Sequence, residues 1–172
     1  MPEGNPAPFS KKVSITVRDV GKSNKCCVFT GLYALPGKFV TVKTPDMALS
    51  QVSIKIGSHK DPLYKRGNPP KSRDPKVTMD FSITSSSQVI GSVYGGLIIV
   101  NLGAAHALTG QTFKIEFDNV IEAPLFNLDT DTNDDWNNHI KNKPAPWTVF
   151  RIPENITFVK GAQSTIHPRQ LD

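Results

Sequence analysis

Apolar and polar residues alternate in several short segments of the chain, a period of two that is typical of half-buried β-strands. In KKVSITVRD the apolar residues are Val13, Ile15 and Val17, with a polar residue between each pair. The same alternation, or a short apolar run bounded by turn residues, predicts eight further strands. They lie at CCVFTGLY, KFVTVKT, QVSIKIG, VTMDFSI, GGLIIVN, TFKIEFDNV, WTVFRI and NITFVK.

One segment, DTDTNDDWNNHIKN, predicts an α-helix. Thr132 or Asp131 can cap its start, acidic residues fill its first turn, and Lys141 lies near its end, all of which suits the helix dipole. Helical crossovers between the strands are missing. We therefore expect a mainly β protein, an antiparallel β-sandwich of about nine or ten strands with one or two short helices.

The length of 172 residues favours one folded domain. We expect an N-terminal extension over residues 1–10, a single β-sandwich domain over residues 11–165 and a C-terminal tail over residues 166–172. A hydrophobic content of 38% and a charged content of 20% are those of a folded globular chain. The 14 prolines and 12 glycines suit short strands joined by frequent turns.

The ends and the cysteines predict a cytoplasmic location. The segment MPEGNPAPFSKK lacks the apolar run of a signal peptide, and GGLIIV is far too short to span a bilayer. Cys26 and Cys27 are neighbours that point to opposite faces of a strand, so they do not easily bridge each other. We expect reduced cysteines and no membrane partner. A secreted location is the alternative if the chain is a fragment of a longer one.

Charge is concentrated in one segment, residues 55–76, which carries seven basic residues against two acidic ones and so has a net charge of +5. These basic residues are Lys55, Lys60, Lys65, Arg66, Lys71, Arg73 and Lys76. One interpretation is a solvated loop, and the other is a loop that docks on an acidic partner. We do not expect nucleic acid, because Tyr64 is the only aromatic residue there and no known nucleic-acid motif surrounds it.

Patterns for known catalytic and metal sites are missing. None of His59, His106, His139 and His167 is followed by Glu, so the H-E-x-x-H zinc motif is not present. The acidic segment from Asp129 lacks the glycine and the final glutamate of a calcium-binding EF-hand loop. No G-x-S-x-G elbow or phosphate-binding loop occurs either. The sequence thus predicts no catalytic residues, no metal and no cofactor, and we do not expect an enzyme.

Five motifs in order resemble the enhancin-like zinc metallopeptidase family, whose members act on mucins and other O-glycosylated proteins. The resemblance covers about Thr30 to Leu171, and the motifs are TGLYALPGKFVTV, VSIKIGSHKDPLY, VYGGLIIV, IEAPLFNLDTDTNDDW and PAPWTVFRIPENITF. The last motif departs from the family, because an acidic residue often follows its Pro-Trp and Thr148 follows here. The resemblance covers only the β-sandwich portion, so it implies no catalytic residue.

The same motifs suggest a second candidate site. Gly95 and Gly96, with His59 and Asp61, would bind a ligand if their turn and strand flank a shared groove. The other interpretation is structural, with the glycines serving turns and close approach of the backbone.

Two functional hypotheses follow. The first is a non-catalytic structural and binding module of an intracellular assembly, whose basic loop docks on an acidic protein such as tubulin in a microtubule. The second is the accessory or glycan-binding half of a secreted, glycoprotein-directed zinc metallopeptidase.

Overall fold

The computed structural model of the chain describes residues 7–17, 27–58, 77–102, 105–128, 130–143, 145–151 and 156–159. Eight described strands belong to one sheet: β1 (Phe9–Thr16), β2 (Cys27–Ala34), β3 (Phe39–Lys43), β4 (Ser53–Ile56), β5 (Met79–Ser82), β6 (Ser87–Gly91), β7 (Gly96–Asn101) and β8 (Thr112–Glu122). A smaller sheet holds β9 (Leu125–Asn127), β10 (Thr148–Arg151) and β11 (Ile156–Val159). The described helices are α1 (Asn133–Asn142) and two 3₁₀ helices, η1 (Asp46–Ala48) and η3 (Ala105–Leu108).

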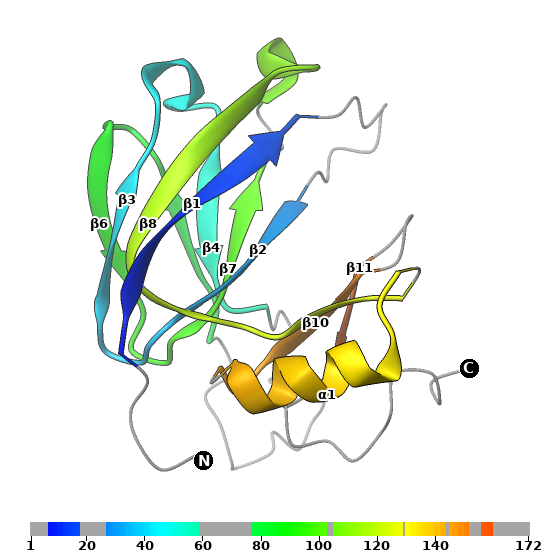
Figure 1. Cartoon of the computed structure of the whole chain (residues 1–172). Helices are drawn as coiled ribbons and strands as arrows, with labels where there is room; N and C mark the ends of the chain where they lie inside the picture. Colours follow the sequence, from blue (N-terminus) through cyan, green and yellow to red (C-terminus); the bar gives the residue numbers. More distant parts are fainter. Residues whose placement is uncertain are drawn as a thin grey trace, which may run out of the picture.

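The large sheet folds over on itself into two layers (Figure 1). Its strand order is β5-β4-β7-β2-β8-β3-β6, with β1 also paired to β8, and all its pairings are antiparallel. The predicted antiparallel, mainly β fold is confirmed, and the strand number is close to the nine or ten expected. The two layers are nevertheless parts of one continuous sheet, which the sequence did not show.

Strand β8 joins the two layers, and it is the long curved strand at the front of Figure 1. Its first part pairs with β1 and β3, and its end pairs with β2 through Tyr33 and Ile121. Between these parts Asn119 has a φ of +66°, and the register with β1 shifts. The side-chain Nδ2 of Asn119 donates to the carbonyl of Phe39 at 2.6 Å. This β-bulge bends the strand so that it can serve both layers.

The main core lies between the layers, because alternate residues of each strand point inward. Ile15, Val42 and Phe117 from one layer, with Ile54 and Val100 from the other, are fully buried. A smaller aromatic cluster holds α1 to the small sheet. In it Phe126 and Phe150 pack on Trp136, with ring centroids 5.1–5.9 Å apart.

The predicted helix is confirmed as α1, which begins after Thr132. The Thr132 hydroxyl accepts from the Asp135 amide at 3.3 Å, and the Asp135 carboxylate accepts from the Thr132 amide at 2.8 Å. This reciprocal pair is a capping box, which satisfies two amides that the helix itself leaves unpaired. Asp131 instead accepts from the Asn127 amide at 2.8 Å. The acidic side chains of Asp131 and Asp135 therefore stabilise the start of the helix. This agrees with the sequence, in which the segment lacks the residues of an EF-hand loop.

Candidate functional site

The predicted basic loop lies almost wholly outside the described residues. Its members Lys60, Lys65, Arg66, Lys71, Arg73 and Lys76, and the groove residues His59 and Asp61, all fall within residues 59–76. Their role in binding stays a prediction.

Lys55, the remaining residue of that group, lies on a strand and not in a loop. It is the third residue of β4, and its side chain is only 8% exposed. Its Nζ lies 3.3 Å from Oδ1 of Asp80, the residue opposite it on β5. Because this ion pair neutralises Lys55 within the sheet, the residue offers little positive charge to a partner.

Gly95 and Gly96 are buried where segments of backbone meet. A Cβ added at Gly95 would lie 2.5 Å from the carbonyl oxygen of Ala34, and one at Gly96 would lie 2.6 Å from the Cα of Gly57. Their φ angles of +65° and +146° also favour glycine. Close approach of the backbone is the structural interpretation that the sequence analysis gave for these two glycines. Neighbouring backbone occupies the space that a side chain at either position would need.

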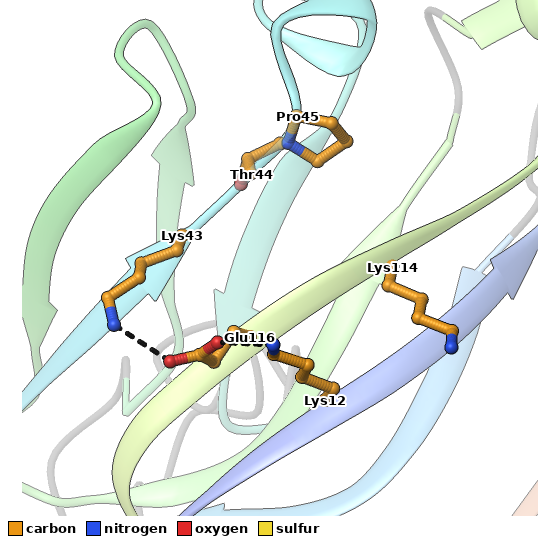
Figure 2. Close-up of a pocket in the computed structure, with 6 residues that line it drawn as sticks. All are labelled: Lys12, Lys43, Thr44, Pro45, Lys114 and Glu116. Atoms are coloured by element: carbon orange, nitrogen blue, oxygen red, sulfur yellow. Dashed lines mark hydrogen bonds and ion pairs between the residues drawn. The ribbon is translucent and has the colours of Figure 1, made fainter.

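The structure instead brings together three lysines that the sequence analysis did not single out. An open hollow of about 350 Å³ on the outer face of the β1–β8–β3 layer is lined by Lys12, Lys43, Thr44, Pro45, Lys114 and Glu116. We call it the lysine hollow (Figure 2). Its three lysines and one glutamate carry a net charge of +2.

Strand register assembles this site. Glu116 on β8 lies directly opposite Lys12 on β1 and opposite Lys43 on β3. The Lys43 Nζ lies 2.8 Å from Oε1 of Glu116, and the Lys12 Nζ lies 3.4 Å from Oε2. Figure 2 shows the two ammonium groups approaching one carboxylate from two strands, while Lys114 extends from β8 toward β1. Among the ion pairs of the described residues, none includes Lys114.

The ion pairs of the hollow shift the pKa values of Glu116 and Lys43. The hydrogen bond from Lys43 is the largest cause that holds the pKa of Glu116 below its ordinary value of 4.5, and Lys12 adds to it. Glu116 in turn raises the pKa of Lys43. The lowered pKa of Glu116 and the raised pKa of Lys43 each favour the charged form of that group.

The lowered pKa of Glu116 predicts a pH dependence. Its ion pairs should contribute stability fully above the unfolded pKa near 4.5, and the contribution should disappear as the pH falls through the lower, folded pKa. Carboxyl NMR titration should therefore give Glu116 a pKa below 4.5, and Lys43→Ala should raise it. Lys38→Ala, at an exposed lysine outside the hollow, should leave it unchanged. The explanation fails if Lys43→Ala does not move the titration.

Thr44, one of the lining residues, has a buried side-chain hydroxyl without a partner among the described residues. Its residue is 4% exposed, and within the described part of the chain its Oγ1 is buried without a hydrogen-bond partner. Such an unsatisfied group costs about 1–3 kcal/mol. Its amide is satisfied, because it donates to the Ser86 carbonyl at 2.9 Å. The hydroxyl is thus a buried polar atom without a partner in the described ranges, on a residue that lines the hollow.

Metal-binding clusters and membrane-spanning helices are both absent from the described residues. Over the described ranges, no three or more His, Cys, Asp or Glu side chains gather where they could hold a metal ion. No helix described by the structure has the length and apolar character to cross a membrane. The arrangement of the lysine hollow suits binding of an anion by charge and hydrogen bonds.

The chain is similar in sequence to several known proteins. A family model for the N-terminal domain of M60-like peptidases matches residues 6–117. TRPM8 channel-associated factor 3 of Mus musculus is 28% identical over 134 residues, a match that covers 77% of this chain and 14% of that protein. Antigenic protein P1 of Entamoeba histolytica is 28% identical over 138 residues, which covers 72% of this chain and 12% of that protein. The family resemblance predicted from the sequence is confirmed.

Solved structures share the fold. The structure of IMPa from Pseudomonas aeruginosa in complex with an O-glycopeptide matches with a TM-score of 0.67 and 19% identity. The match covers 90% of this chain and 18% of that one. At this identity the likeness shows the fold alone. The chain spans less than a fifth of the length of each of these three proteins.

Proposed function

Because the chain belongs to the family of N-terminal domains of M60-like peptidases, we propose that it is a non-catalytic domain that docks on an acidic partner protein. The observation that carries the proposal is the lysine hollow, where Lys12 and Lys43 pair with the single carboxylate of Glu116 and Lys114 lines the same hollow. Complementary charge steers association and selects partners. The matched family model describes a domain N-terminal in peptidases, which supports a binding role over a catalytic one.

The relatives support a protein as the partner. Several are named for association with the TRPM8 channel, which is itself a protein. Tubulin, the acidic surface favoured from the sequence, has no support in these names. The proposal places the domain in the cytoplasm, where Cys27, a free cysteine on β2, would stay reduced.

Charge-neutralising variants test the proposal in three arms. The first replaces Lys12, Lys43 and Lys114 with glutamine, and the second replaces the exposed Lys38 and Lys141 as a control. The third replaces the six basic residues of the segment 59–76. Each protein is used to capture partners from an extract of its own cells at low and high salt, and the captured proteins are identified by mass spectrometry.

The proposal predicts that wild type and the Lys38/Lys141 control retain the same partner at low salt and lose it at high salt. The hollow variant should lose it at both salt concentrations while keeping the circular dichroism spectrum and the cooperative unfolding of a folded chain. Retention by the hollow variant would contradict the proposal. Loss of the partner only in the third variant would instead place the binding surface on residues 59–76, the segment predicted from the sequence.

A second function is favoured by the fold neighbour that was solved with an O-glycopeptide. In this alternative the domain is the accessory or glycan-binding part of a longer, glycoprotein-directed zinc metallopeptidase. It predicts saturable binding of an O-glycosylated peptide and none of the same peptide without its sugar. Cleavage of either peptide by this chain in the presence of zinc would contradict the non-catalytic proposal.

A further inference from the structure

We propose that the lysine hollow is a binding site for a phosphate group, carried by a phosphorylated segment of the partner protein. The inference rests on the proposed function and deepens it, because it names the group that the partner presents. It concerns the described residues Lys12, Lys43, Lys114 and Thr44 around Glu116.

The charge of the hollow matches a phosphate monoester. Glu116 pairs with Lys43 and Lys12, so the three lysines and one glutamate leave an excess of two positive charges. A phosphorylated side chain carries about 1.5 to 2 negative charges at neutral pH. One carboxylate would neutralise only half of that excess. A compact dianion is therefore the better complement.

The donors of the hollow remain available. Each ammonium carries three N–H donors, and Lys43 and Lys12 each direct only one interaction to Glu116. Lys114 belongs to none of the ion pairs found among the described residues. The side-chain hydroxyl of Thr44 is buried, so it is not one of these available donors.

The sheet holds these donors in place before any ligand arrives. Lys12, Glu116 and Lys43 are in register across three neighbouring strands, and Lys114 lies two residues before Glu116 on the same face of β8. Such preorganisation lowers the entropy cost of binding. The hollow has no aromatic side chain in its lining, which disfavours stacking of nucleic-acid bases.

Removal of a lysine ammonium and removal of the Glu116 carboxylate should change the affinity for phosphate in opposite directions. Lys114→Ala removes an ammonium that no resident carboxylate uses, so it should weaken phosphate binding about threefold to tenfold. Glu116→Gln removes the anion that competes with phosphate and should tighten it. Thr44→Val should leave phosphate binding unchanged, because the hydroxyl that it removes is buried. Lys38→Ala, outside the hollow, should not change it.

The experiment titrates the full chain, followed by NMR, with one short neutral peptide in three forms that carry serine, phosphoserine or aspartate. The proposal predicts tightest binding of the phosphoserine form, shifts centred on Lys12, Lys43, Thr44 and Lys114, and the order of variants given above. Inorganic phosphate, titrated separately, should shift the same signals. Equal binding of the phosphoserine and aspartate forms, or equal loss in Lys114→Ala and Lys38→Ala, would overturn it.

Other outcomes separate this inference from the proposed function. If the phosphopeptide does not bind but partner capture still depends on the hollow lysines, the phosphate inference is wrong and the docking proposal stands. If the phosphopeptide binds but no partner depends on the hollow, the docking proposal is wrong. Tighter binding of a random single-stranded oligonucleotide than of the phosphopeptide, with a steep loss in salt, would overturn the inference in favour of nucleic acid.

Discussion

Gly96→Ala is expected to lower the free energy of unfolding by about 4 kcal/mol, the sum of a strained backbone and an overpacked contact. Gly96 has a φ of +146°, and an added Cβ would lie 2.6 Å from both Cα and N of Gly57. The Gly57 amide donates to the Leu97 carbonyl at 2.9 Å, so the two segments cannot separate without losing that bond. Because the contact is between two backbones, no side chain can rotate to relieve it.

Denaturant unfolding followed by circular dichroism measures this loss, with Gly37→Ala as the matched control. Gly37 has a φ of +67°, but nothing lies within 4 Å of the Cβ that alanine would add. Its substitution should lower the free energy of unfolding by only about 1–2 kcal/mol, because alanine must adopt the left-handed backbone conformation there. A similar loss for both variants would show that the close approach of Gly96 to Gly57 contributes nothing.

Phe117→Ala is expected to destabilise the chain by about 3–5 kcal/mol, from lost burial and the cavity that remains. Phe117 is fully buried in the main core, on the strand that joins the two layers. A domain of this kind has about 5–15 kcal/mol of stability in total, so the variant should be close to unfolding. Phe117→Leu, which keeps most of the volume, should remain folded if the alanine variant does not.

Phe39→Ala provides the control with the same chemical change. Phe39 lies on β3 with 71% of its surface exposed, so truncation should change the free energy of unfolding by less than about 0.5 kcal/mol. Thermal and denaturant unfolding of both variants against wild type gives the comparison. Equal effects at the two positions would contradict the assignment of the core to the space between the layers.

The local elements could be predicted from the sequence because they depend on local patterns. Alternation at Val13 and Ile15 predicted β1, and the acidic start with Thr132 predicted α1. Strand β6 was missed because SQVIG has few apolar residues and its Val89 is exposed. Strand β9 was missed because its three residues are too few to show an alternation of apolar and polar positions.

The site could not be predicted, because it depends on register between strands that are far apart in the sequence. Lys12, Lys43 and Glu116 each occupy an outward position of a predicted strand, which is an ordinary place for a charged residue. Only the pairing of β8 with both β1 and β3 puts the three side chains in one row. Register likewise explains why the ion pair of Lys55 with Asp80, its partner residue on β5, could not be predicted from the sequence.

Chemical acetylation of lysines, applied to the free chain and to the captured complex and followed by mass spectrometry, tests the central claim most directly. The account predicts that the partner protects Lys12, Lys43 and Lys114 from modification and leaves the exposed Lys38 and Lys141 as reactive as in the free chain. Protection confined to Lys38 and Lys141, or to the lysines of residues 59–76, would contradict the lysine hollow as the docking site.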